Sequence, residues 1–215
     1  MRIILSVLCI IVSLTSAQSQ DIGSDIENKN DAAYAFAKAY QEQLNATYKN
    51  PDSTILSKEQ LKDFKGLDFY KIDTKYRVTA TFTPSVLKLP VAIETSTGVP
   101  RTYNTHGTVT FEIDGEEQQL TVFQNPAFIQ TPNHKYKNTL LLGFTDTTSG
   151  QGSYGGGRYV DILTTDIQNG VIVIDFNKAY NPYCAYTEGY SCAIPPAENE
   201  LTVAIKAGVK LADAH

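Results

Sequence analysis

The spacing of hydrophobic residues changes along the chain, from a helical period near the N-terminus to a strand period further on. Between residues 31 and 49, apolar side chains recur every three or four positions, as on one face of an amphipathic helix. Asp31 is expected to cap this helix, and Pro51 is expected to end it. Ser57 and Gln60 have the spacing of a capping box, which predicts a second, shorter helix.

After residue 69 the hydrophobic period falls to two. In the segment 76–82, apolar side chains alternate with Arg and Thr, the pattern of a half-buried strand. Further strands are expected at 91–94, 139–144, 158–163, 171–176 and 201–207.

Two dipeptides predict tight turns between strands. Asp114-Gly115 separates two alternating runs and is a strong hairpin signal. Asn169-Gly170 predicts a second turn, which would make the strands on either side of it a hairpin. Short strands without intervening helices predict a mainly β fold, an antiparallel sandwich or partly open barrel, with one or two N-terminal helices. We expect one β-rich domain over residues 31–215.

The first seventeen residues have the composition of a secretory signal peptide. Arg2 precedes an apolar run from Ile3 to Leu14, and small polar residues follow around Ala17. The run is too short to span a bilayer as a helix. The sequence therefore predicts a periplasmic or secreted protein with no integral membrane segment after cleavage, and a disordered stretch over residues 18–30.

Charge and cysteine content narrow the class of protein further. The chain has 18 Lys and Arg and 23 Asp and Glu, and loss of Arg2 leaves 17 − 23 = −6. An acidic chain without a basic cluster disfavours nucleic-acid binding. Cys184 and Cys192 remain after cleavage, and two nearby cysteines in an exported protein predict a disulfide. Buried free thiols are the alternative, since no His lies at a spacing typical of a zinc site.

A glycine-rich loop (residues 145–158) contains the pattern G-x-G-x-x-G at Gly150, Gly152 and Gly155. In dinucleotide-binding folds these glycines open a helix whose N-terminal amides face the pyrophosphate. Here strands follow the glycines, so we expect no nucleotide cofactor.

The same loop has the chemistry for holding an anion. Consecutive glycines can turn several N–H groups inward, and the planar fork of Arg158 suits a carboxylate or phosphate. Asp146 stands near the start of the loop. The alternative is that the glycines only bend the chain, while Arg158 pairs with Asp146 or Asp161 as a structural ion pair.

A second segment, the Tyr/Pro/Cys loop (residues 177–199), follows Asp175 at the end of a predicted strand. Its prolines exclude a central strand, so the segment is expected to be a pinned loop. Tyrosines within it, among them Tyr180 and Tyr186, could form an aromatic wall with polar tips. The alternative is a disulfide-bound loop that packs on the sheet.

Four motifs in this chain resemble the domain-of-unknown-function family 1684, which is found in bacteria and archaea. They are "FKGLDFY-KIDTKYRV", "FTDTTSGQGSYGGGRYVD", "DFNKAYNPYCAY" and "CAIPPAENEL", and the resemblance extends from about Tyr40 to Gly208. The family has no agreed activity to carry over. Similar proteins without a signal peptide carry the cysteine pair, which leaves paired thiols as an alternative to the disulfide. The family pattern singles out Asp146, Thr148, Gly150, Tyr154, Gly157, Arg158, Asp161, Asp175, Asn177, Tyr180, Asn181, Pro182, Cys184, Tyr186, Cys192, Pro196 and Asn199.

Three functional hypotheses follow. The first is a non-catalytic envelope module that binds a small anionic or polar ligand between the two loops. The second is a hydrolase-like enzyme with Asp146 or Asp175 as general base. The third is a scaffold or protein-interaction domain. No metal site and no cofactor are expected. The predicted ligand-binding residues are Asp146, Thr148, Tyr154, Gly157, Arg158, Asp161, Asp175, Asn177, Tyr180, Asn181 and Tyr186.

Overall fold

The computed structural model describes residues 30–211. The predicted signal peptide and residues 18–29 of the predicted disordered stretch lie outside this range. Residues 30–49 are helical, and the helix ends before Pro51, as the sequence predicts. Because Asn30 is already helical, Asp31 lies inside the helix and the prediction that it is the N-cap is wrong.

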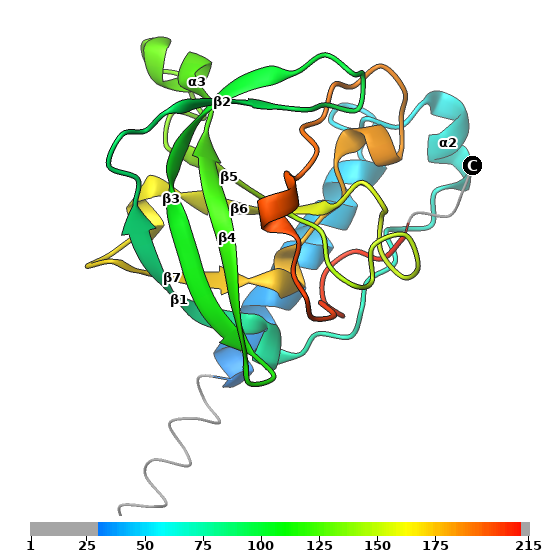
Figure 1. Cartoon of the computed structure of the whole chain (residues 1–215). Helices are drawn as coiled ribbons and strands as arrows, with labels where there is room; N and C mark the ends of the chain where they lie inside the picture. The colour runs from blue at the N-terminus through cyan, green and yellow to red at the C-terminus, as the bar shows by residue number, and fades with distance from the viewer. Residues whose placement is uncertain (1–29, 212–215) are drawn as a thin grey trace, which may run out of the picture.

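The body of the protein is an antiparallel sheet that curls into a half-barrel (Figure 1). The strand order is β6-β5-β4-β3-β1-β7, and the short β2 also pairs with β3. The predicted mainly β fold is confirmed. The strands are β1 (Arg77–Pro84), β2 (Pro90–Ile93), β3 (Arg101–Ile113), β4 (Glu116–Gln124), β5 (Thr139–Phe144), β6 (Arg158–Leu163) and β7 (Val171–Asp175).

Short helices and 3-10 turns connect the strands. The capping box before α2 is formed, because Ser57 Oγ accepts from Gln60 N and Gln60 Oε1 accepts from Ser57 N. The short helices are α2 (Lys58–Asp63), α3 (Pro126–Gln130), η1 (Thr74–Tyr76), η2 (Thr164–Asp166), η3 (Phe176–Lys178), η4 (Tyr183–Ala185) and η5 (Ala197–Asn199).

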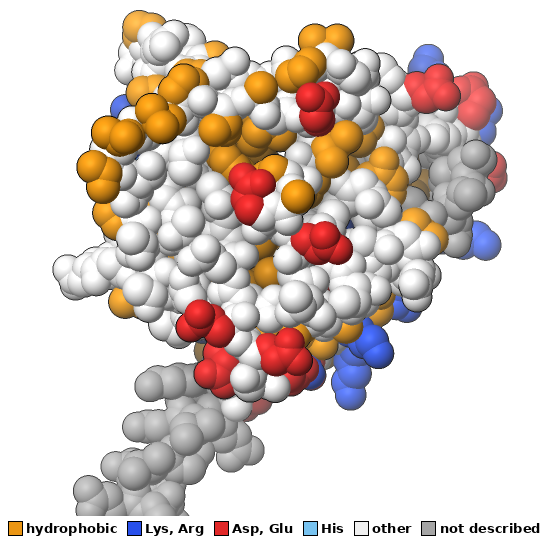
Figure 2. Space-filling model, in the orientation of Figure 1, with side chains coloured by type: hydrophobic (Ala, Val, Ile, Leu, Met, Phe, Trp, Pro, Cys, Tyr) orange, Lys and Arg blue, Asp and Glu red, His pale blue; other side chains and the backbone are white. Residues whose placement is uncertain are grey.

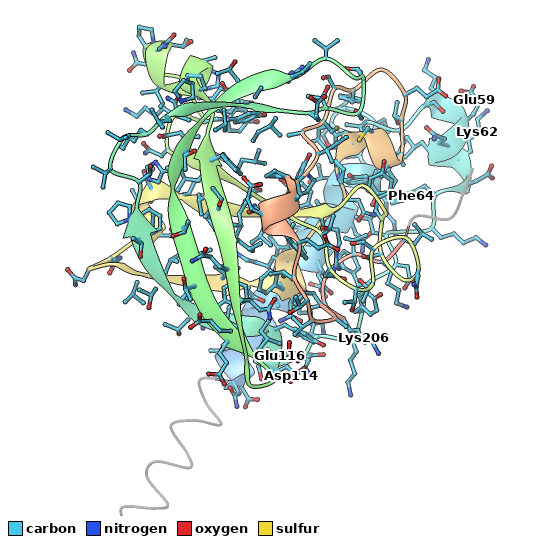
Figure 3. The ribbon with its side chains drawn as sticks, in the orientation of Figure 1. Glu59, Lys62, Phe64, Asp114, Glu116 and Lys206 are labelled. Carbon is cyan, nitrogen blue, oxygen red and sulfur yellow. The ribbon has the colours of Figure 1, made fainter. Side chains whose placement is uncertain are left out.

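The β3–β4 hairpin forms at the predicted turn. Asp114 and Gly115 both have positive φ angles, 54° and 82°, as a type I′ turn requires. Figure 3 shows Asp114 and Glu116 at the tip of this hairpin. There Asp114 forms an exposed ion pair with Lys75, with Nζ and Oδ2 3.0 Å apart.

The second predicted hairpin is wrong. Asn169 and Gly170 do form a turn, with φ angles of 52° and 75°. The strands on either side of it, β6 and β7, are at opposite ends of the strand order and do not pair. The turn brings the chain back to β1 instead, where Phe82 N donates to Gly170 O at 2.8 Å. The curvature of the half-barrel makes this possible with a short connection.

The predicted strand at 201–207 is also wrong, although its apolar alternation is real. Leu201, Val203, Ile205 and Ala207 are buried in the main core. No described strand pairs with the segment, and carbonyl groups within it accept hydrogen bonds from a side chain, Arg158. Alternation alone therefore located a buried extended segment but not its hydrogen-bond partners.

The N-terminal helix lies along the open side of the half-barrel, between the edges formed by β6 and β7, as the blue ribbon in Figure 1 shows. Ala37 is buried against the body, and Gln41 Nε2 donates to Asn177 O at 2.9 Å. Tyr40 lies near Lys178, with its ring centroid 5.5 Å from Nζ. Among the helices of residues 30–211, none has the length and apolar character needed to cross a membrane.

Candidate functional site

The glycine-rich loop and the Tyr/Pro/Cys loop lie side by side. Tyr159, just after the first loop, exchanges backbone hydrogen bonds with Tyr180 of the second, at 2.9 and 3.0 Å. Gly157 has a φ of +85°, and a Cβ placed on it would lie 2.6 Å from Pro195 Cγ. Only glycine fits this crossing point without strain.

Arg158 lies in the interior, where it forms an ion pair with Asp146. Its Nη2 is 2.6 Å from Asp146 Oδ2, and the two side chains are 1% and 0% exposed. The guanidinium also donates to Ile205 O at 2.8 Å and to Ala207 O at 2.5 Å. Burial lowers the pKa of Arg158, and the nearby Asp146 carboxylate opposes that shift. Arg158 therefore holds the C-terminal segment against the glycine-rich loop.

The other polar groups of the glycine-rich loop bond to one another. Asp146 Oδ1 accepts from Thr148 N at 2.5 Å, and Ser149 Oγ accepts from Asp146 N at 3.1 Å. The hydroxyls of Thr148 and Ser153 are 2.8 Å apart. These bonds fix the shape of the loop and hold Asp146, Thr148 and Ser153 in the interior, whereas Thr147 and Gln151 are exposed.

Several polar groups of the Tyr/Pro/Cys loop also have partners within the protein, although the buried Asn181 Oδ1 has none among the described residues. Tyr180 Oη donates to Asp161 Oδ1 at 2.7 Å, and burial, with a smaller effect of Asp161, raises the pKa of Tyr180. Asn181 Nδ2 donates to Tyr186 Oη and to Lys210 O, both at 3.0 Å. These contacts attach the loop to β6 and to the C-terminal segment.

The two cysteines face each other beside the glycine-rich loop as free thiols. Cys184 N donates to Cys192 Sγ at 3.3 Å, and Tyr154 Oη is 4.0 Å from Cys184 Sγ. Burial raises the pKa of the Cys192 thiol to about 11. At neutral pH a thiol with this pKa is protonated, which argues against a nucleophilic role for Cys192.

We expect Cys184 and Cys192 to be joined in protein recovered from an oxidising compartment. Ellman titration of the denatured, unreduced mature protein should find no free thiol. The bridge should raise the free energy of unfolding by roughly 2–3 kcal/mol, because it restrains the unfolded chain. Two free thiols per chain would contradict this expectation.

A groove of about 690 Å³ lies along β7, on the side of the molecule covered by the N-terminal helix. Its lining includes Val171 and Val173, which are both more than one-third exposed, and Phe36 from the N-terminal helix. Residues of η2 and of the turn that follows it also line the groove. The groove therefore combines apolar and polar lining residues.

Asp175 lines this groove with a carboxylate that is only half satisfied. The residue is 4% exposed, and its Oδ1 accepts from both the backbone N and Nδ2 of Asn177 at 3.0 Å. Its Oδ2 is buried and has no hydrogen-bond partner among the described residues. Asn177 itself bonds to Asp73 and fixes the orientation of Asp175. A buried carboxylate oxygen without a donor is costly, so it marks a place where a donor is expected.

Two cations lie beside Asp175 in the same groove. Arg77 is its direct partner in the antiparallel register of β1 and β7, so both side chains belong to one face of the sheet. Lys178 Nζ lies 5.1 Å from the ring centroid of Phe36. Neither cation forms an ion pair with another residue of the range 30–211. The groove thus presents two cationic groups that are open to an anion.

Comparison with known proteins identifies the family of this chain. The family model described as "Protein of unknown function (DUF1684)" matches residues 62–210. The chain belongs to DUF1684. The matched region contains both loops and the cations and carboxylate of the β7 groove, whereas the N-terminal helix lies before it.

One solved structure is similar to this DUF1684 protein over most of its length. It is a solution NMR structure of an uncharacterized protein of Haloarcula marismortui, 31% identical in sequence. The alignment covers 90% of the present chain and 96% of the archaeal one, with a TM-score of 0.61. No curated protein matches the chain.

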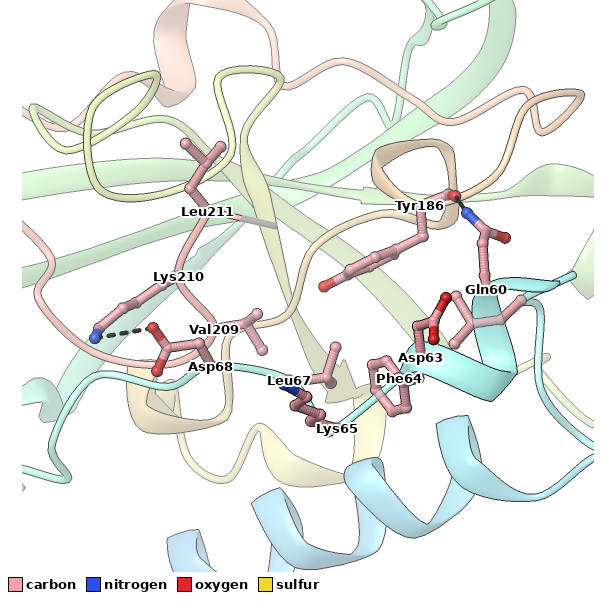
Figure 4. Close-up of a pocket in the computed structure, with 12 residues that line it drawn as sticks. Gln60, Asp63, Phe64, Lys65, Leu67, Asp68, Tyr186, Val209, Lys210 and Leu211 are labelled. Atoms are coloured by element: carbon pink, nitrogen blue, oxygen red, sulfur yellow. Dashed lines mark hydrogen bonds and ion pairs between the residues drawn. The ribbon is translucent and has the colours of Figure 1, made fainter. Parts of the chain in front are cut away.

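A second cavity of the DUF1684 protein, of about 240 Å³, lies between α2 and the C-terminal segment (Figure 4). Two pairs of its polar groups are joined, as the dashed lines in Figure 4 show, whereas Asp63 and Lys65 carry no such line. Lys210 Nζ is 3.1 Å from Asp68 Oδ2, and Gln60 Nε2 donates to Tyr186 O at 2.7 Å. This cavity is smaller than the β7 groove and part of its polar lining is already paired.

The residues predicted from the sequence thus separate into two sets in the DUF1684 structure. Asp175 lines the β7 groove and Asn177 positions it, while Arg158 and Asp146 lie in the interior. Arg77, Lys178 and the apolar residues of the groove were not predicted from the sequence. Their position depends on the register between β1 and β7 and on where the helix lies. The exposed alternate valines of β7 were the one available signal.

Proposed function

We propose that this exported DUF1684 protein is a non-catalytic binding module, and that its ligand occupies the β7 groove. In this proposal the N-terminal signal peptide directs the chain to the periplasm or the medium. The observation that carries the proposal is the buried, unpartnered Oδ2 of Asp175 in a groove that also contains the unpaired cations Arg77 and Lys178. Arg158 was predicted to bind the anion, but it is bonded to groups in the interior. In this proposal Arg77 and Lys178 bind the anion instead.

The groups around the groove define the class of ligand. An anionic group would be held by Arg77 and Lys178, since guanidinium and ammonium groups both donate to carboxylates. A donor such as an ammonium group would supply the missing partner of Asp175. An apolar side chain would cover Val171 and Val173. A small zwitterion with an apolar side chain, as in a neutral amino acid, meets all three requirements.

The groove favours binding over catalysis. Its lining contains no serine, cysteine or histidine that could act as a nucleophile or as a general base near neutral pH. Of the two carboxylates considered as general bases, Asp146 is paired with Arg158. Asp175 is held by Asn177 and retains one buried oxygen without a hydrogen-bond partner among the described residues. The geometry gives that oxygen an accepting role toward a bound donor.

Binding of L-leucine, measured by isothermal titration calorimetry, tests the proposal. Two analogues separate the contacts, because 4-methylpentanoate lacks the ammonium group and 3-methylbutylamine lacks the carboxylate. We expect L-leucine to bind more tightly than either. Arg77→Gln should raise the Kd of L-leucine and of 4-methylpentanoate by about tenfold or more, the loss of one hydrogen bond between charged groups.

Asp175→Asn provides the matched comparison. It should weaken L-leucine binding and leave 4-methylpentanoate binding unchanged, because only L-leucine carries the donor. Arg101→Gln, at an exposed arginine outside the groove, should have no effect on either ligand. An absence of L-leucine binding up to about 10 mM, roughly 3 kcal/mol of binding free energy, would contradict the proposal.

A further inference from the structure

A separate surface, the aliphatic loop (residues 85–89), protrudes where β1 ends and β2 begins. Its three large apolar side chains are mostly exposed: Val86 is 94% exposed, Leu87 71% and Leu89 56%. The backbone of this loop is nevertheless fixed, because Ser85 N donates to His106 O and Leu89 O accepts from Thr105 N, both at 3.0 Å. A well-anchored loop thus presents apolar side chains to the outside, which is typical of a contact surface.

The sequence on either side of this loop contains lysines and no carboxylate. Residues 74–93 and 118–145 contain no Asp or Glu, although the whole chain has 23 of them. Lys88 lies at the centre of the loop. Lys137 lies further off, beyond β3: Pro90 pairs with Asn104, Asn104 pairs with Gln124, and Gln124 Nε2 donates to the carbonyl of Lys137 at 3.2 Å. In Figure 2 the orange side chains at the upper left are not accompanied by red ones.

We propose that the aliphatic loop inserts into the interface of a bilayer that contains anionic lipid. Aliphatic side chains on a convex loop can enter the acyl boundary without a complementary pocket, whereas a protein partner would need one. Lysines beside them would contact lipid phosphates, and each contributes about 1 kcal/mol near an anionic surface. The net charge of −5 opposes adsorption of the chain as a whole, so attachment depends on this local arrangement.

The absence of tryptophan from the chain gives a direct test. In the full chain, Leu87→Trp introduces a single indole whose emission reports only its own surroundings. We expect a blue shift on addition of vesicles of phosphatidylcholine with phosphatidylglycerol, and a smaller shift with phosphatidylcholine alone. This local readout separates the loop from the apolar N-terminal residues, which could also bind vesicles.

Val99→Trp is the matched control, because Val99 is exposed at the opposite end of the β2–β3 ladder. Its emission should not change. Adding Lys88→Glu to Leu87→Trp should lower partitioning to the anionic vesicles on the order of tenfold. If the vesicles bind the protein but Leu87→Trp shows no blue shift, the proposal is overturned. A blue shift that grows with protein concentration without vesicles would also overturn it, in favour of self-association.

Discussion

Arg158→Met is expected to lower the free energy of unfolding by about 3–5 kcal/mol. The variant keeps an unbranched apolar stem but removes the charge that neutralises Asp146, whose side chain is 0% exposed. It also removes the donors that bond to the carbonyls of Ile205 and Ala207. Urea unfolding followed by circular dichroism measures the effect.

Two controls distinguish the effect of breaking a buried ion pair from the effect of removing any charge. Lys75→Met breaks the exposed pair with Asp114 and should cost less than about 1 kcal/mol. Asp146→Asn added to Arg158→Met should recover part of the lost stability, since the buried carboxylate is then uncharged. A loss below about 1 kcal/mol in Arg158→Met would contradict the structural role of the pair.

Asn199→Ala is expected to lower the free energy of unfolding by about 2–4 kcal/mol. The side chain of Asn199 bridges two strands: Oδ1 accepts from Thr121 N at 2.7 Å, and Nδ2 donates to Thr121 O at 2.9 Å and to Gly143 O at 2.7 Å. The strands β4 and β5 pair only at Phe123 and Leu141. The side-chain amide of Asn199 therefore replaces backbone hydrogen bonds that are missing between the two strands. Truncation leaves three backbone groups without partners in a buried place.

Asn199→Asp tests the orientation of that amide. A carboxylate keeps the acceptor for Thr121 N but directs its second oxygen at two carbonyls, so this variant should be at least as unstable as Asn199→Ala. Asn138→Ala, at an exposed asparagine, should change the free energy of unfolding by less than about 0.5 kcal/mol. Similar stabilities of Asn199→Asp and the wild type in urea would show that the amide does not join the strands.

Local sequence patterns predicted the strands well where the alternation of apolar and polar residues within a segment is enough to define the strand. The strands at 139–144 and 158–163 have the predicted bounds, and the Asp114-Gly115 hairpin is confirmed. Pairing between strands was harder to predict. Asn169-Gly170 turns the chain without pairing β6 to β7, and the segment 201–207 uses side-chain donors in place of a strand. Both depend on contacts distant in sequence.

The candidate site shows the same limit. The sequence around a polar loop residue looks the same whether its side chain faces a ligand or bonds to the backbone of its own protein. Arg158 and Asn199 bond to internal carbonyls, and these contacts depend on segments 47 to 78 residues away in the sequence. Asp175 was identified because it ends a strand in an unusual motif. Arg77 could be placed beside it only through the β1–β7 register.

The β7 groove is the proposed ligand site, and a titration followed by backbone amide signals tests this most directly. Heteronuclear NMR spectra of the 15N-labelled protein would be recorded with increasing L-leucine. We predict that the largest shift changes fall on residues 171–178 and Arg77, with residues 146–158 unaffected. Changes confined to the glycine-rich loop, with β7 unchanged, would contradict the account.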